Sequence, residues 1–166
     1  MNSKLRIVLV ATAILLFGAG AARTTYAAPP TDACSLLTEA QVSTVLGVPA
    51  AGRALGPKSC IWVQTGVKPG STRRRVDLVI LIMQGYTGGY AVATMPNAPT
   101  SATHVSGLGD DAYYLSMRSG APTMELRVKK GGVAFGIRVQ SDGTPFTPDQ
   151  IKAKEKTLAL EILAKL

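Results

Sequence analysis

The chain has few of the residues from which enzyme sites are usually built. It contains a single histidine, two cysteines and no C-x-x-C pair, which disfavours both a Cys/His metal site and a redox pair. Neither a G-x-S-x-G elbow nor a glycine-rich loop followed by Gly-Lys-Ser/Thr occurs. We therefore expect no catalytic, metal-binding or cofactor-binding residues of a familiar type, and no cofactor.

The first 27 residues have the pattern of a secretory signal peptide. The basic residues Lys4 and Arg6 precede an apolar run over residues 7–17. Small residues follow, and Thr25 and Ala27 place small side chains at the two positions that a signal peptidase reads. The mature chain would begin near Ala28 and act in the periplasm or outside the cell. It would contact a membrane only transiently, through this peptide.

Two other interpretations of this region are disfavoured. An uncleaved anchor needs about 20 apolar residues, whereas residues 7–22 form a shorter segment that contains Gly18 and Gly20. Lipidation of Cys34 is disfavoured because Asp32 precedes it, where lipid attachment requires small or apolar residues. Cleavage of the peptide is our prediction.

The mature chain has the size of one domain, since residues 28–166 number 139. Removing the peptide takes away three positive charges and lowers the net charge from +8 to +5. A basic exported protein can meet anionic lipid, polysaccharide or acidic protein. Nucleic acid is not an expected partner, because export separates the protein from it.

The two cysteines, Cys34 and Cys60, predict a disulfide in an oxidising compartment. The bond would close a loop of 27 residues. Loop entropy then suggests roughly 3 to 4 kcal/mol of stabilisation.

Two helices have well-marked ends in the sequence. In the first, over residues 39–46, Thr38 and Gln41 can form a capping box, and Gly47 permits a left-handed end. The second begins at the Thr147 cap and continues close to the C-terminus. Its apolar face is predicted to contain Ile151, Leu158, Ile162 and Leu163, with Lys152, Glu155 and Lys156 lying elsewhere.

Runs of apolar residues predict about five strands, over residues 60–64, 76–83, 112–117, 125–129 and 133–139. The strand over 76–83 is apolar on both faces, so we expect it to be central and covered on both sides. Residues 50–58 are interpreted as a loop. Residues 85–100 could form a short helix, but Gly88 and Gly89 favour a loop.

These elements predict an α+β fold in two layers. An antiparallel sheet of about five strands would be flanked by an N-terminal and a C-terminal helix, both on one face of the sheet.

Short motifs add a resemblance to a known family. They are Cys34-Ser35-Leu36-Leu37-Thr38, Cys60-Ile61-Trp62 and Gly107-Leu108-Gly109-Asp110. Together they make the chain similar to small exported bacterial proteins of unknown function, the domain of unknown function 3558 and its relatives. The likeness spans most of the mature chain and implies a cell-envelope domain with Cys34 and Cys60 paired. This chain lacks the lipid-attachment cysteine of the lipoprotein members.

One histidine and one acidic pair are the candidates for acid–base chemistry. Asp110 and Asp111 could bind a cation or act as acid and base. Neighbours entering a strand point to opposite faces, so we favour a structural turn. His104, in a predicted loop, has no identifiable Ser, Cys or Asp partner for a triad. An envelope enzyme that uses His104 with Asp110 or Asp111 stays an alternative, which a concave pocket joining these side chains would support and a wide separation would exclude.

Two further sets of side chains could contact a partner. The three consecutive arginines, Arg73, Arg74 and Arg75, could bind phosphate or carboxylate groups of lipid or envelope polymer, or they could simply solvate a strand entrance. Candidate ligand contacts are the tyrosines Tyr86, Tyr90, Tyr113 and Tyr114, although core or rim packing is the commoner role of tyrosine. One of the last two should lie at the surface or in a groove, because successive strand residues face opposite ways.

We therefore expect a non-enzymatic binding module for an envelope protein or a small ligand. Its surface would comprise residues 85–100 and the aromatic residues, since long loops often carry function. An envelope enzyme and electrostatic attachment to an anionic lipid or polymer are the alternatives.

Overall fold

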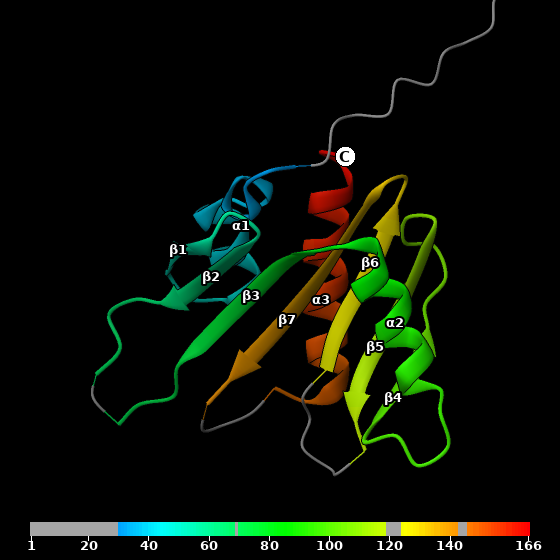
Figure 1. Cartoon of the computed structure of the whole chain (residues 1–166). Coiled ribbons are helices and arrows are strands. Elements are labelled where there is room, and N and C mark those ends of the chain that lie inside the picture. The colour runs from blue at the N-terminus through cyan, green and yellow to red at the C-terminus, as the bar shows by residue number, and fades with distance from the viewer. Residues whose placement is uncertain (1–29, 69, 119–123, 143–145) are drawn as a thin grey trace, which may run out of the picture.

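A computed structural model describes residues 30–68, 70–118, 124–142 and 146–166 (Figure 1). The predicted signal peptide lies outside these ranges. In chain order the elements are the 3-10 helix η1 (Ala33–Leu36), α1 (Glu39–Leu46), β1 (Ala50–Gly56), β2 (Ser59–Gln64), β3 (Arg74–Leu81), α2 (Met83–Ala93), β4 (Thr100–His104), β5 (Asp111–Met117), β6 (Met124–Lys130), β7 (Val133–Ser141) and α3 (Pro148–Leu163).

The described strands form one antiparallel sheet in the order β1-β2-β3-β7-β6-β5-β4. The α+β class is confirmed, but the sheet has seven strands rather than about five. The two unexpected strands, β1 and β4, are its edges. Neither shows an alternation of large apolar residues, so only pairing with β2 and β5 makes them strands.

The helices α1 and α3 pack together on one face of the sheet, as predicted (Figure 1). The main core lies beneath them and includes the fully buried Trp62, Leu78 and Phe135. Gly52 of β1 lies against the indole, where a Cβ would approach Trp62 Nε1 to 2.7 Å. Because glycine has no side chain, the backbone of β1 can pack directly against the Trp62 ring.

Both predicted helix starts are confirmed. The Thr38 hydroxyl accepts a bond from the Gln41 amide, and the Gln41 side chain accepts one from the Thr38 amide. Thr147 and Gln150 form the same capping box at α3. Gly47 ends α1 at a φ of 69°, a conformation that glycine adopts without steric cost.

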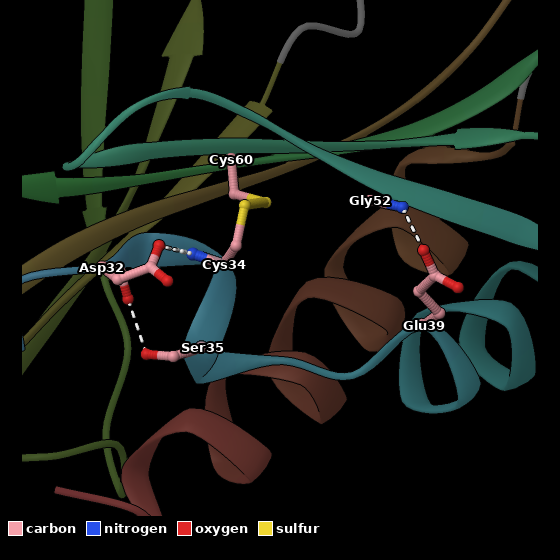
Figure 2. Close-up of a disulfide and its surroundings, with 6 residues drawn as sticks. All are labelled: Asp32, Cys34, Ser35, Glu39, Gly52 and Cys60. Atoms are coloured by element: carbon pink, nitrogen blue, oxygen red, sulfur yellow. Dashed lines mark hydrogen bonds between the residues drawn. A yellow bond between two sulfur atoms is a disulfide. The ribbon is translucent and has the colours of Figure 1, made fainter.

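The predicted disulfide between Cys34 and Cys60 is present (Figure 2). It joins η1, rather than α1 itself, to β2. Asp32 caps η1, because its carboxylate accepts a bond from the Cys34 amide at 2.9 Å. The disulfide therefore attaches η1 to the core face of the sheet, where Cys60 of β2 is buried.

The interpretation of residues 85–100 as a loop is wrong. Residues 83–93 form α2, and β4 begins at Thr100. The antiparallel order makes β3 and β4 run parallel at well-separated places in the sheet. Parallel strands require a crossover, usually a helix. The helix α2 provides it and lies on the face opposite α1 and α3, so the two-layer prediction also lacked a partial third layer (Figure 1).

The strand predicted over residues 76–83 is shorter at one end, because Met83 begins α2. Its core-facing residues are buried, but Val79 on the other face is 39% exposed. The expectation that both faces are covered is therefore wrong at this residue.

The placement of Glu155 away from the core-facing side of the last helix is also wrong. Its side chain is fully buried, and one carboxylate oxygen accepts a bond from the Val139 amide at 2.9 Å. The β6–β7 ladder ends at Leu126 and Ile137. Glu155 thus supplies a hydrogen-bond partner to Val139, two residues past the last pair of the β6–β7 ladder. Its polar type gave no sign of this buried role in the sequence.

Candidate functional site

The face of the sheet that carries α2 bears polar and aromatic side chains instead of an aliphatic core. Strand register places Asp77 opposite Arg138, and Arg127 opposite both Gly136 and Tyr113. His104 lies opposite Tyr113 on the edge strand. Five strands thus present chemically active side chains to the side on which α2 lies.

Three of the four candidate tyrosines come together beneath α2. The rings of Tyr86 and Tyr90 lie 5.1 and 5.2 Å from that of Tyr113. The Tyr113 hydroxyl donates to the Tyr86 carbonyl oxygen at 2.7 Å, and the Tyr86 hydroxyl donates to Asp111 at 3.0 Å. These contacts anchor α2 on β5.

Gly89 explains how a helix can approach this face so closely. A Cβ there would collide with Arg127 Nη1 and come within 3.1 Å of the Tyr113 hydroxyl. Gly88, by contrast, faces open space. The glycine pair that favoured a loop in the sequence therefore contains one residue that α2 needs for docking.

A charged network continues from the tyrosines across the face. Arg127 and Glu125 pair at 2.7 Å, and the other oxygen of Glu125 pairs with Arg138 at 2.7 Å. Arg127 Nη1 also donates to the Gly85 carbonyl oxygen at 3.2 Å and to the Tyr113 hydroxyl at 3.5 Å. A single guanidinium therefore links the ion pairs of the sheet to the backbone of α2.

Burial and neighbouring charges both shift the pKa values of this network. Burial raises the pKa of both Tyr86 and Tyr113, which strengthens the preference of the two hydroxyls for the protonated, donating form. Burial alone would lower the pKa of Arg127, but the neighbouring Glu125 outweighs it and the pKa is raised. Burial also raises the pKa of Asp77, against the attraction of Arg75 and Arg138.

His104 and Asp111 lie close together, which the sequence did not indicate. His104 is in β4 rather than in a loop, and its Nδ1 lies 3.4 Å from Asp111 Oδ1. The imidazole side chain is 61% exposed and stacks at 5.0 Å on Tyr90. Asp110 does not join them, since its carboxylate accepts a bond from the Gly131 amide.

The remaining predicted contact residues do not join this cluster. Tyr114 faces the main core and donates to the Lys152 carbonyl oxygen of α3 at 2.9 Å, so both Tyr113 and Tyr114 are buried and the expectation of a surface tyrosine among them is wrong. Burial raises the pKa of Tyr114 to about 12.

The three arginines at the start of β3 diverge. Arg74 donates to the Leu46 carbonyl oxygen at 2.8 Å, on the face of α1, and also lies over the Phe146 ring. Arg75 lies on the opposite face, 3.4 Å from Asp77, and Arg73 is exposed. The structure therefore does not gather them into one anion site.

Sequence reasoning missed the network of Glu125, Arg127 and Arg138. A signal was present, because opposite charges occupy the alternate positions of β6 and β7 that point away from the core. Such positions ordinarily face solvent. Only the path of α2 shows that some of them are half-buried.

Within the described ranges, no group of three or more His, Cys, Asp or Glu residues could hold a metal ion. No helix found there is long and apolar enough to cross a membrane. The disulfide indicates an oxidising, exported environment.

No protein-family model matches the chain, and neither the curated proteins nor the solved structures contain a significant match. The resemblance to the domain of unknown function 3558 therefore stays a prediction.

Proposed function

We propose that this chain is an exported cell-envelope protein that binds another protein through the outer side of α2. The observation that carries the proposal is the contrast between the two sides of that helix. Its inner side is fixed by Tyr86 and Gly89 to the polar network. Its outer side and flanks expose the apolar side chains of Ile82, Met83, Val92 and Met95.

The chemistry of this outer side suits protein recognition. Met83 and Val92 lie near the two ends of α2, and Ile82 and Met95 lie just outside it, so the exposed apolar side chains are spread along the helix. Exposed apolar side chains are used at interaction surfaces. Methionine adds a flexible, polarisable contact that adapts to a partner. Since the network beneath keeps α2 in place, the surface is ordered before binding and less conformational entropy is lost on association.

Export to the periplasm or the cell exterior is part of this proposal. Its support is the disulfide together with the signal-peptide pattern of the first 27 residues. The resemblance to a family of envelope proteins points the same way.

The test is affinity capture from the envelope fraction of the native host, followed by native mass spectrometry. The matched variants are Val92→Lys and Leu160→Lys, because both wild-type side chains are 49% exposed and the second lies on α3. We expect Val92→Lys to lose the partner and Leu160→Lys to retain it. Equal capture by the two variants would reject the α2 surface.

A second candidate is acid–base catalysis, which the His104–Asp111 distance of 3.4 Å favours. The carboxylate could orient the imidazole, whose exposed side would meet a substrate. A hydrolase screen with wild-type protein and His104→Gln tests it. Turnover that disappears in the variant would support this candidate, and inactivity of the wild-type protein against the panel would leave the binding role as the sole proposal.

A further inference from the structure

The two edges of the sheet differ in how their backbone groups are satisfied. At β1 the Gly52 amide donates to the Glu39 carboxylate at 2.8 Å (Figure 2), and the Ala50 amide donates to the Ser43 hydroxyl at 3.0 Å. Both acceptors belong to α1. The register of β1 is also broken near Ala54 and Gly56. The edge at β1 is therefore capped against another strand.

The edge at β4 is open at Ala102 and His104, whereas the Thr100 carbonyl oxygen accepts a bond from Arg118 Nε. The Val105 amide donates to the Ala112 carbonyl oxygen, and the Arg118 amide donates to the Pro99 carbonyl oxygen. These two bonds show that the odd-numbered residues from Pro99 to Val105 bond inward to β5. In an antiparallel ladder the backbone groups of alternate residues point away from the neighbour. Those of Ala102 and His104 therefore point out of the sheet.

The side chains of β4 do little to block a further strand. Its sequence, Thr-Ser-Ala-Thr-His, contains no proline, lysine or acidic residue, which are the usual protectors of an edge. Among the described elements, β5 and α2 make the main contacts with β4. In Figure 1 the strand lies at the outer margin of the sheet.

We propose that a second copy of this chain pairs with the β4 edge in antiparallel orientation. A two-fold axis at Ala102 and perpendicular to the sheet would join the two sheets into one. Ala102 would bond to Ala102 of the second copy, and Thr100 would lie opposite His104. Because the β1 edge is capped, the pairing closes at a dimer rather than extending into a fibre.

Charge also favours a second copy as the occupant. At one end of β4, Arg118 Nε donates to the Thr100 carbonyl oxygen at 3.0 Å, so the guanidinium lies along the edge. At the other end, His104 lies against the Asp111 carboxylate. Antiparallel pairing brings these opposite ends together, so each Arg118 approaches the acidic end of the other copy. Parallel pairing of two β4 strands would place like ends side by side, so Arg118 would not meet the acidic end of the other copy.

This dimer goes beyond the proposed function. Residues that face each other across an antiparallel pair project to the same side. Both α2 helices would therefore lie on one face of the joined sheet, and the dimer would present two binding surfaces to the same side.

Residue-resolved amide hydrogen exchange tests the pairing in the exported protein without any mutation. In the dimer, Ala102 and His104 should be protected, as their inward-bonded neighbours Ser101 and Thr103 are. Dilution should remove the protection of the first two amides and leave that of the second two. Fast exchange of Ala102 and His104 at every concentration would overturn the proposal.

Analytical ultracentrifugation of variants gives an independent test. Ala102→Pro removes an outward amide, and Arg118→Glu reverses the charge at the contact. We expect each to raise the dimer dissociation constant by about tenfold or more. Arg53→Glu on the capped β1 edge is the control and should leave the dimer intact.

Circular dichroism confirms that each variant is folded, and Arg118→Glu remains informative if proline disturbs β4. A monomeric wild-type protein up to about 1 mM, or a dimer that survives both substitutions, would contradict the pairing. Neither result bears on partner binding through Val92, so the two proposals fail separately.

Discussion

The two faces of the sheet carry different kinds of side chains. The face beneath α1 and α3 is almost wholly apolar, with Trp62, Leu78 and Phe135 fully buried. The opposite face, beneath α2, carries tyrosines and a chain of ion pairs centred on Glu125 and Arg127. The first face supplies most of the burial on which stability depends.

The second face fixes the position of α2 on the sheet. Half-buried ion pairs add little net stability, because desolvation offsets much of their attraction. They do, however, hold α2 in one orientation through Arg127, Gly85 and Tyr113. A surface that binds a partner needs such fixed geometry more than it needs added stability.

The largest expected effect compares neighbouring residues of β3 that face opposite ways. Leu78 is fully buried in the main core, whereas Val79 is 39% exposed on the α2 face. Leu78→Ala should lower the free energy of unfolding by about 3 to 5 kcal/mol, because it leaves a cavity. Val79→Ala should cost less than about 1 kcal/mol. Urea unfolding of both variants measures the difference, and equal losses would contradict the assignment of the two faces.

The disulfide belongs to the apolar face and should contribute nearly as much. Replacing both Cys34 and Cys60 by Ser should lower the free energy of unfolding by roughly 3 to 4 kcal/mol, since the loop is no longer closed. Thermal unfolding of the oxidised wild-type protein and the variant measures it. If the variant were as stable as the wild-type protein, the bond would not be part of the structural core.

Glu155 is the one fully buried acidic side chain of the described core, and it makes stability depend on pH. Burial raises its pKa from 4.5 to about 8 in the folded chain. Between these values the folded state binds more protons than the unfolded state, so this residue's contribution to stability is present below pH 4.5 and is lost as pH rises through 8.

We expect this residue to lower the free energy of unfolding by about 2 to 4 kcal/mol between pH 5 and pH 8, allowing for some relaxation of the ionised form. Glu155→Gln keeps an acceptor for the Val139 amide and should flatten this dependence. Urea titrations of both proteins at several pH values provide the measurement. An unchanged slope in the variant would assign the dependence to other groups.

The smallest expected effect distinguishes the two glycines of α2. Gly88→Ala should stabilise the protein by about 0.5 to 1 kcal/mol, since alanine favours a helix and the site is open. Gly89→Ala should instead destabilise it by about 1 kcal/mol, because the methyl group displaces Arg127 from its hydrogen bonds. Stabilisation by both substitutions would show that α2 does not dock as closely as described.

The predictable parts of this fold were those with local signals. Capping boxes at Thr38 and Thr147 marked two helices, and the pair of cysteines marked the disulfide. The parts that were missed depend on distant partners. The strands β1 and β4 acquire their structure from β2 and β5, and α2 from a crossover that only the strand order requires.

In the candidate site, too, some features had local signals in the sequence and others depend on distant partners. All four tyrosines were named from the sequence, and strand alternation predicted that Tyr113 and Tyr114 face opposite ways, but nothing local showed that α3 would bury Tyr114. The closeness of His104 to Asp111 depends on the pairing of β4 with β5, and β4 itself was not predicted. Register, rather than residue type, decides which side chains meet.

The most direct test of the central claim is photo-crosslinking in the envelope of the native host. A photoreactive amino acid is placed at Val92 on α2 or, as the control, at Leu160 on α3, both 49% exposed. We expect a discrete crosslinked partner from position 92 and none from position 160. The same partner from both positions, or from position 160 alone, would contradict the assignment of α2 as the binding surface.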